Sequence, residues 1–209
     1  MGIITKIELQ KKNKGRVSLF VDGEFVCSLS LETIMQKRLK AGKEIDADEI
    51  RDAVCEDEKK RAFGDVLDLI SRKPSTKKQA RQYLEKKSYM EQAVDCAIAK
   101  AEEYGYIDDG KYAEQYLSFY GAKSGKFKLK FDLANKGVDR ALIDEILDGH
   151  DDGDAAYGIL QKYLRGEKPA DKKEKERATR YLLSKGCTFE AVKRAFQRLD
   201  EVKNGDDGE

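Results

Sequence analysis

One sequence pattern recurs three times along this chain of 209 residues, at a constant spacing of 49 residues. Its copies occupy residues 80–98, 129–147 and 178–196. A chain that repeats at a fixed period of this length is built from copies of one structural unit, and stacking buries the surface that a single copy leaves open. The apolar positions that align are Leu84, Leu133 and Leu182, followed by Val94, Ile143 and Val192.

Each copy predicts two helices joined by a tight turn. Ser88, Gly137 and Gly186 follow an aligned lysine at a position where a helix ends, and glycine there readily adopts the left-handed conformation. A further helix is expected before each pair, over residues 61–71, 112–120 and 155–164. Acidic residues before the second and third of these helices are typical of N-caps. The repeating unit therefore contains three helices.

The first 45 residues have a different pattern, which predicts strands over 3–10, 16–21 and 24–28. Asp22 and Gly23 join the last two strands, and this dipeptide is typical of a two-residue hairpin turn with positive φ at both positions. Ser30 or Thr33 is expected to cap a short helix that ends near Gly42. So few strands need a partner surface, so this unit is expected to pack on helices.

The predicted fold is mainly α: three tandem three-helix, helix-turn-helix-like repeats in an elongated array, with a small N-terminal β-hairpin unit. A helix that begins near Asp46 either ends near Glu58 or continues into the first repeat. The expected parts are a β unit with a short helix (1–45), a connecting helix (46–59), three repeats (60–107, 108–150 and 151–202) and an acidic tail (203–209).

Composition excludes several functional classes. The 41 basic and 40 acidic residues nearly cancel, and no run of 18 apolar residues exists that could cross a membrane. The four cysteines are scattered, which indicates small buried side chains in a reducing cytoplasm. His150 is the only histidine and is expected to be a solvated loop residue. No phosphate-binding glycine motif occurs. We expect a protein that is not an enzyme and has no cofactor, metal or membrane partner. We also expect it to be a monomer.

Charge is distributed unevenly along the repeats. The middle helix of each repeat is basic and the connections are acidic, with Lys77, Lys126 and Lys175 in register. A solvated helical face explains one such helix, but three copies in register favour a basic ribbon along stacked units. Such a ribbon could follow a nucleic-acid backbone, bind a repetitive acidic protein surface, or line a peptide-binding solenoid.

Linked motifs resemble those of the RecX family. Residues 66–89, VLDLISRKPSTKKQARQYLEKKSY, are followed by AEEYGYIDDGKYAEQYLSF at 101–119 and by RATRYLLSKGCTFEAV at 177–192. The resemblance covers about residues 60–199, and the N-terminal hairpin is similar to an extension of many Gram-positive members. Position 88 departs from the family pattern, since serine stands there in place of the usual glycine.

The resemblance implies a negative regulator of the RecA recombinase, acting in recombination, DNA repair and the SOS response. Such a regulator binds the groove of the RecA filament on single-stranded DNA across adjacent subunits, and limits filament growth, strand exchange and co-protease activity. Two alternatives stay open: a direct single-stranded DNA-binding protein, and a helical-repeat adaptor unrelated to recombination. The residues expected to bind the partner are Arg72, Lys73, Lys77, Lys78, Arg81, Lys126, Lys128, Lys130 and Lys175.

Overall fold

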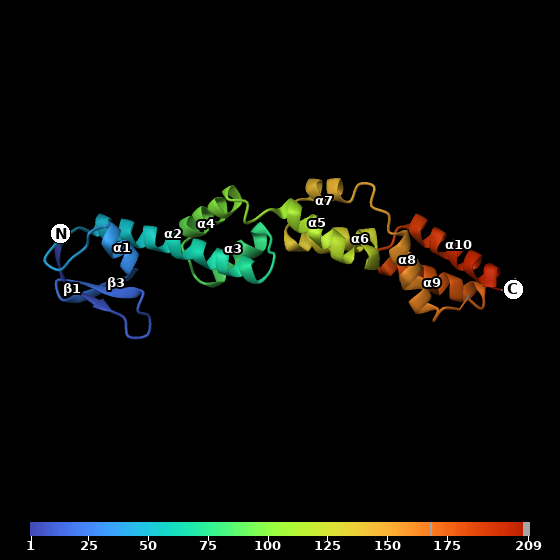
Figure 1. The fold of residues 1–209 in the computed structure, drawn as a ribbon, viewed down its shortest axis with the longest axis horizontal. Helices are drawn as coiled ribbons and strands as arrows, with labels where there is room; N and C mark the ends of the chain where they lie inside the picture. The colour runs from blue at the N-terminus through green and yellow to red at the C-terminus, as the bar shows by residue number, and fades with distance from the viewer. Residues whose placement is uncertain (168, 207–209) are drawn as a thin grey trace. The chain divides into compact units, whose positions relative to one another are not determined.

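The computed structural model describes residues 1–167 and 169–206, so residues 207–209 of the expected acidic tail lie outside the described part. The chain divides into two compact units. Unit 1 comprises Met1–Ser75 and Ala80–Ile107, and unit 2 comprises Thr76–Gln79 and Asp108–Glu209. Within the described residues the fold is mainly helical, with ten α-helices, one 3₁₀ helix and four strands (Figure 1).

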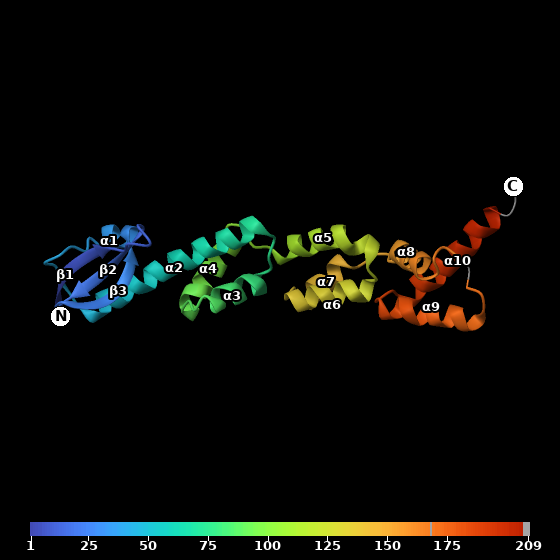
Figure 2. The ribbon, with the colours of Figure 1, turned by 90° about the horizontal axis from the view of Figure 1, so that it is seen from below.

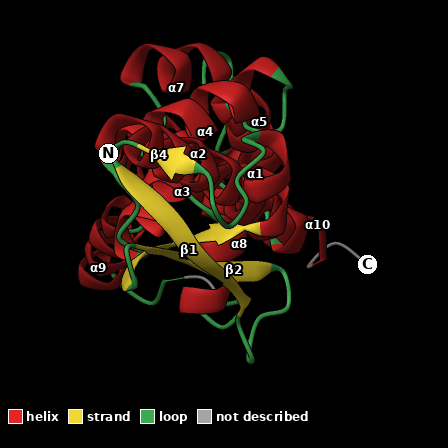
Figure 3. Ribbon diagram, turned by 90° about the vertical axis from the view of Figure 1, so that its left-hand side faces the viewer, coloured by secondary structure: helices red, strands yellow, loops and turns green. Residues whose placement is uncertain are grey.

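The N-terminal strands of unit 1 form one antiparallel sheet (Figure 3), in which residues 24–30, 16–21, 2–9 and 44–45 lie in that order. The three predicted strands are confirmed as β1 (Gly2–Leu9), β2 (Arg16–Val21) and β3 (Glu24–Ser30). The predicted turn between β2 and β3 is also confirmed, because Asp22 has φ 51° and Gly23 has φ 86°. The short strand β4 (Glu44–Ile45) was not predicted, since two residues carry no alternating pattern.

Helix α1 (Leu31–Gln36) follows the sheet and is shorter than predicted. Ser30 is its N-cap, as expected, because its hydroxyl oxygen accepts a hydrogen bond from the Thr33 N–H at 3.1 Å. The helix does not reach Gly42. That glycine instead has φ 84° in the turn that leads into β4.

Helix α2 (Ala47–Arg72) runs without interruption for 26 residues, so the helix that begins at Asp46 does continue into the first repeat. Asp46 and Glu49 form a capping box at its start. The first half of α2 packs under the sheet, where Ala53 joins a core with Ile4 and Leu19. Its second half belongs to a separate helical core. One helix therefore provides the partner surface that the small sheet needs.

The helical core of unit 1 lies between α2, α3 (Lys77–Lys86) and α4 (Glu91–Glu103). Leu84 and Val94, the first members of the aligned apolar sets, are fully buried in it. Ser88 takes the left-handed conformation with φ 59°, although it is not glycine. A side chain in this conformation costs roughly 1–2 kcal/mol, so the first turn keeps the geometry of the others at an energetic cost.

Unit 2 holds two further helical cores (Figure 2). One lies between α5 (Asp109–Tyr120), α6 (Lys126–Lys136) and α7 (Arg140–Ile146). The 3₁₀ turn η1 (Gly121–Lys123) connects α5 to α6. The other lies between α8 (Gly153–Tyr163), α9 (Lys172–Ser184) and α10 (Phe189–Asp206).

The predicted register of unit 2 is confirmed. The aligned side chains Leu133, Ile143, Leu182 and Val192 are all buried. Gly137 and Gly186 end their helices with φ 94° and 81°.

Some buried positions were predicted wrongly. Cys96 is exposed and two other cysteines are half-buried, so only Cys187 behaves as a small buried side chain. His150 is not a freely solvated loop residue. Its Nε2 atom is buried without a hydrogen-bond partner in the described part, and its ring lies against Gly121.

Candidate partner-binding surface

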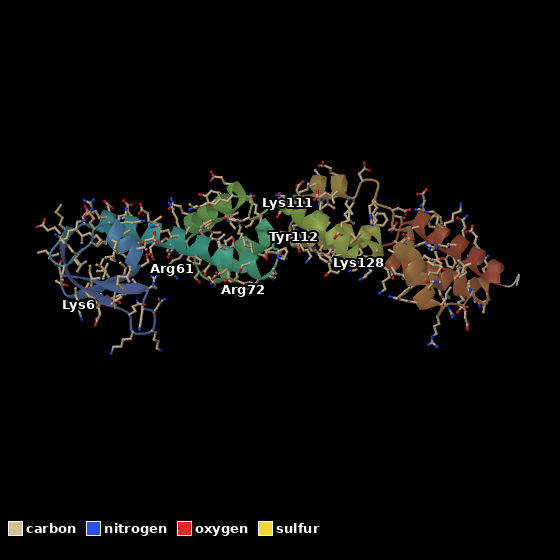
Figure 4. The ribbon with its side chains drawn as sticks, viewed as in Figure 1. Lys6, Arg61, Arg72, Lys111, Tyr112 and Lys128 are labelled. Carbon is tan, nitrogen blue, oxygen red and sulfur yellow. The ribbon has the colours of Figure 1, made fainter. Side chains whose placement is uncertain are left out.

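Three of the nine candidate basic residues belong to unit 1. Arg72, labelled in Figure 4, is the last residue of α2, and Lys73 is its C-cap. Both are exposed, and neither side chain has a partner within the described residues. Arg81 differs, because its guanidinium pairs with Asp95 of α4, and this hydrogen bond raises the pKa of Arg81. Of the three candidates in unit 1, Arg72 and Lys73 therefore remain available to a partner.

A second charged cluster of unit 1 is satisfied internally. The Tyr89 hydroxyl donates to Asp65 Oδ2 at 2.6 Å, and Lys87 Nζ lies 2.9 Å from Asp65 Oδ1. Burial, helped by the hydrogen bond to Asp65, raises the pKa of Tyr89 to about 12. The Arg61 guanidinium covers the Tyr89 ring at 5.5 Å from its centroid. This cluster ties the turn after α3 to α2, and its one carboxylate pairs with Lys87, while Arg61 is exposed over the Tyr89 ring.

Helix α6 presents three of the candidates on unit 2. Lys126 is its first residue, and its ammonium has no partner within the described part of the chain. Lys128 Nζ lies 3.1 Å from Asp132 Oδ2, and Lys130 Nζ lies 2.5 Å from Asp144 Oδ1. Nearly half of each of these lysine side chains is exposed, so the pairs contribute at most about 1 kcal/mol each and can be exchanged for contacts with a partner.

Two aromatic side chains lie on the same helix and were not predicted as site residues. Phe127 and Phe131 are 62% and 66% exposed, and they share one face because they are four residues apart. The signal was present in the sequence KFKLKF at 126–131, where both phenylalanines fall outside the buried spacing of Leu129 and Leu133. Exposed aromatic residues of this kind commonly anchor protein interfaces.

Helix α9 presents one further candidate, Lys175. Its ammonium lies 5.1 Å from the centroid of the Phe196 ring of α10, and its side chain is exposed. Lys175 also lines an open depression of about 390 Å³, together with Lys172, Glu176, Thr179 and Arg180. The exposed face of α9 is therefore basic, like that of α6.

A buried aspartate connects the two helical cores of unit 2. Asp152 is only 2% exposed, and its carboxylate accepts three hydrogen bonds. The Lys126 N–H donates to Oδ2 at 3.1 Å and the Thr188 N–H to the same oxygen at 2.8 Å, while the Thr188 hydroxyl donates to Oδ1 at 2.7 Å. Asp152 stands at the N-cap position of α8, where an acidic cap was expected, but its side chain makes no cap bond there; the Asp151 carboxylate accepts from the Gly153 N–H at 2.9 Å. Asp152 instead binds the start of α6 to the turn after α9.

A glycine allows these two elements to approach closely. The Phe127 N–H donates to the Gly186 carbonyl oxygen at 2.9 Å. A Cβ atom at position 125 would lie 2.1 Å from the Gly186 carbonyl carbon, so only glycine fits there. Helix α6 therefore begins where the turn after α9 ends. We call this contact, formed by Gly125–Phe127, Asp152 and Gly186–Thr188, the α9–α6 joint.

The start of α3 makes an equivalent contact. Residues Thr76–Gln79 cluster with unit 2. Within that unit, the Lys77 N–H donates to Asp109 Oδ1 at 2.8 Å and the Thr76 hydroxyl donates to the Lys136 carbonyl oxygen at 2.6 Å. Lys77 aligns with Lys126 of the α9–α6 joint, and in both places the acceptor is an aspartate at the start of the next three-helix segment. The same joint chemistry is thus used twice.

Other kinds of site find no support in the described residues. Among residues 1–167 and 169–206, no cluster of histidine, cysteine, aspartate and glutamate side chains has the arrangement of a metal site. No helix in that part of the chain combines the length and apolar character needed to cross a membrane. The basic, aromatic surface of α6 and α9 is the feature that calls for a functional explanation.

Proteins of a known family are similar in sequence to this chain over nearly its full length. The regulatory protein RecX of Clostridium beijerinckii is 32% identical over 208 residues, which cover 97% of this chain and 98% of that protein. The chain belongs to the RecX family. The RecX of Clostridium tetani is 34% identical over 202 residues, covering 94% of each chain. A family model described as the regulatory protein RecX N-terminal domain matches residues 2–46, which span the sheet and α1.

Solved structures of RecX proteins have the same fold. The crystal structure of one regulatory protein RecX aligns with a TM-score of 0.70 at 24% identity, covering 92% of this chain and 98% of that one. The RecX of Lactobacillus salivarius aligns with a TM-score of 0.63 at 20% identity, over 69% of this chain and 97% of that one. The fold described above is therefore a RecX fold.

Proposed function

We propose that this RecX protein is a negative regulator of RecA that acts by binding and not by catalysis. It binds the groove of the RecA filament on single-stranded DNA, contacts adjacent RecA subunits, and limits filament growth, strand exchange and co-protease activity. The protein acts as a monomer. Membership in the RecX family supports RecA as the partner, and the surface of unit 2 supports the mode of binding.

The observation that carries this proposal is the α9–α6 joint. It joins the start of one basic helix to the turn that follows another, so the cations of α6 and α9 are held in fixed relative positions within unit 2. At about 1.5 Å per residue, the 11 residues from Lys175 to Gly186 place Lys175 about 17 Å from the joint, where Lys126 lies. A partner built from repeating subunits offers its binding sites at regular intervals, and each contact after the first gains from the high effective concentration.

The exposed phenylalanines of α6 give this surface an anchor that lysines alone would lack. Protein interfaces are enriched in aromatic residues and depleted in lysine, and a few buried aromatic side chains carry much of the binding energy. In this proposal Phe127 and Phe131 enter an apolar site on one RecA subunit. Lys126, Lys128 and Lys130 then pair with carboxylates around it. Exchanging the internal partners of Lys128 and Lys130 for those of RecA loses little energy.

The same proposal divides the chain into three helical repeats and three further segments. The three helical cores are taken as the three-helix repeats 60–107, 108–150 and 151–202. Residues 1–45 form the N-terminal unit, 46–59 connect it to the array, and 203–209 are a tail. Arg72, Lys73, Lys77, Lys78 and Arg81 are the proposed partner-binding residues of the first repeat. The repeated joint chemistry of Lys77 and Lys126 supports this order.

The test is RecA ATPase activity on single-stranded DNA with increasing amounts of this protein. Reversal of the three aligned lysines, Lys77→Glu, Lys126→Glu and Lys175→Glu together, is expected to raise the half-inhibitory concentration at least tenfold, which corresponds to about 1.4 kcal/mol. The matched control reverses three exposed lysines outside the middle helices, Lys40, Lys162 and Lys193. It changes the net charge by the same amount and is expected to inhibit like the wild type.

Each outcome bears on a different part of the proposal. No inhibition by the wild-type protein would contradict RecA regulation itself. Equal inhibition by the wild type and both variants would remove the middle helices from the interface, while leaving RecA as the partner. Equal loss in the two variants would show that net charge, not the surface of the middle helices, governs inhibition.

A further inference from the structure

A second basic surface lies in unit 1, on the loop between β1 and β2. The loop carries Lys11, Lys12 and Lys14, all of which are exposed. None of the three has an ion-pair or hydrogen-bond partner among the described residues. The residues from Leu9 to Val21 include no acid at all, in a chain that has 40 acidic residues. Lys37, Lys43 and Lys60 of the same unit differ from the loop lysines, because each of these lysines pairs with a glutamate.

The nearest carboxylates along the chain are already occupied. Glu8 accepts a hydrogen bond from Lys6 Nζ at 2.9 Å, and Asp22 accepts one from the Ile3 N–H at 2.9 Å. Figure 4 shows long side chains that end in nitrogen and project from this loop, away from the sheet. The three ammonium groups therefore repel one another in the isolated protein, and an anion placed among them would relieve that repulsion.

The loop that carries these lysines is ordered by its own backbone. The Gln10 N–H donates to the Arg16 carbonyl oxygen at 3.0 Å, and the Arg16 N–H donates to the Asn13 carbonyl oxygen at 3.0 Å. The Asn13 side chain accepts from the Gly15 N–H at 3.1 Å, and the Gly15 carbonyl oxygen accepts from the Leu31 N–H at 3.0 Å. Because the loop is already fixed, binding has to immobilise only the lysine side chains.

The fourth cation of the hairpin is not available to a ligand. Arg16 turns inward, where its guanidinium donates to the Ser28 carbonyl oxygen at 2.7 Å and to Asp57 Oδ2 at 3.3 Å. The loop thus presents three flexible point charges and no planar guanidinium fork. It also presents no aromatic side chain.

This composition favours a phosphate backbone over an acidic protein surface. Protein interfaces are depleted in lysine and depend on aromatic residues and arginine, which this loop does not present. Lysine contacts to phosphate need no fixed geometry and give affinity without sequence preference. We propose that the β1–β2 loop, through Lys11, Lys12 and Lys14, is a sequence-independent binding site for the phosphate backbone of DNA. The proposed interaction does not require RecA.

The test measures the salt dependence of binding to a fluorescent oligothymidylate by anisotropy, without RecA, between 50 and 200 mM NaCl. Each phosphate neutralised on single-stranded DNA contributes about 0.7 to the slope of log K against log salt, and on duplex DNA about 0.9. The variant Lys11→Gln, Lys12→Gln, Lys14→Gln is therefore expected to lower the magnitude of the slope by about 2 on the oligothymidylate and by about 3 on a duplex. Affinity for either DNA is expected to fall at least tenfold at 50 mM.

The control replaces three lysines of unit 1 that already face carboxylates. Lys37, Lys43 and Lys60 pair with Glu56, Glu49 and Glu32, so the change Lys37→Gln, Lys43→Gln, Lys60→Gln alters the net charge equally. This control is expected to keep the wild-type slope. Far-UV circular dichroism and thermal unfolding of each variant establish that the sheet is intact.

Three results would overturn the proposal: no binding of DNA by the wild type at 50 mM salt, an unchanged slope in the hairpin variant, or equal losses in the hairpin variant and its control. Stronger binding of polyglutamate than of oligothymidylate, lost in the hairpin variant, would assign the loop to acidic proteins instead. RecA ATPase assays on the same variants keep this result separate from the proposed function, because inhibition through α6 and α9 is expected to persist without the loop lysines.

Discussion

Gly125→Ala is expected to destabilise this protein by about 2–4 kcal/mol. The added Cβ would lie 2.1 Å from the Gly186 carbonyl carbon and 2.2 Å from the Cys187 nitrogen. Both are backbone atoms and cannot rotate away, so α6 must move by more than an ångström to restore a contact of about 3.5 Å. Overpacking of this kind costs about 1–3 kcal/mol, and loss of the bond from the Phe127 N–H adds about 1 kcal/mol.

The same chemical change at another glycine of unit 2 is expected to have the opposite sign. Gly158 lies inside α8, and a Cβ there would meet no heavy atom within 4 Å. Gly158→Ala is expected to stabilise the protein by about 0.5–1 kcal/mol, because alanine is the better helix former.

Urea unfolding followed by circular dichroism at 222 nm measures the free energy of unfolding of both variants. A change of the same sign and size in the two variants would refute the close approach at the α9–α6 joint. A stable Gly125→Ala protein that still inhibits RecA fully would show that the joint does not organise the binding surface.

Further predictions concern the sheet and the helical cores. Asp57 is 2% exposed, accepts hydrogen bonds from Ser30 and Thr33, and forms an ion pair with Arg16. Asp57→Ala is therefore expected to lower the free energy of unfolding by about 3–5 kcal/mol in urea titrations. Burial opposes ionisation of Asp57, but these bonds outweigh it and hold its pKa below the ordinary value. The ionised Asp57 carboxylate therefore contributes its full stabilisation above the unfolded pKa of about 3.9, and this stabilisation is lost as pH falls through the lower folded pKa. The melting temperature of the wild type should show this loss at acid pH, and that of Asp57→Asn should not. Leu133→Ala is expected to cost about 2–5 kcal/mol in the same urea assay, and a loss below 1 kcal/mol would contradict its burial.

Local signals predicted much of this fold from the sequence. The Asp22–Gly23 dipeptide specified a hairpin turn because positive φ at both positions excludes most other residues. The 49-residue register identified buried leucines, since an apolar side chain that recurs at equivalent helical positions belongs to a core. Ser88 adopts the left-handed turn of its glycine counterparts because the flanking helices impose that geometry.

Tertiary contacts decided what the sequence could not reveal. Asp152 follows a run of polar residues typical of a linker, yet it is buried, because Thr188 and the start of α6 approach it from distant parts of the chain. Arg81 and Lys130 were predicted from the sequence to bind the partner. Only the folded chain shows the carboxylates that pair with them. Phe127 and Phe131 were visible in the sequence, but a helical pattern alone does not establish whether an extra apolar residue is covered.

Photocrosslinking to RecA filaments tests the central proposal most directly. A photoreactive phenylalanine analogue is placed at position 131 on α6 and a second at position 180 on α9, both exposed in the structure. If the joined helices contact adjacent subunits, irradiation on single-stranded DNA should yield adducts of one RecX chain with two RecA chains, and each single-site variant should yield only one-to-one adducts. Exclusive one-to-one adducts from the doubly substituted chain, formed efficiently from both positions, would contradict binding across adjacent subunits.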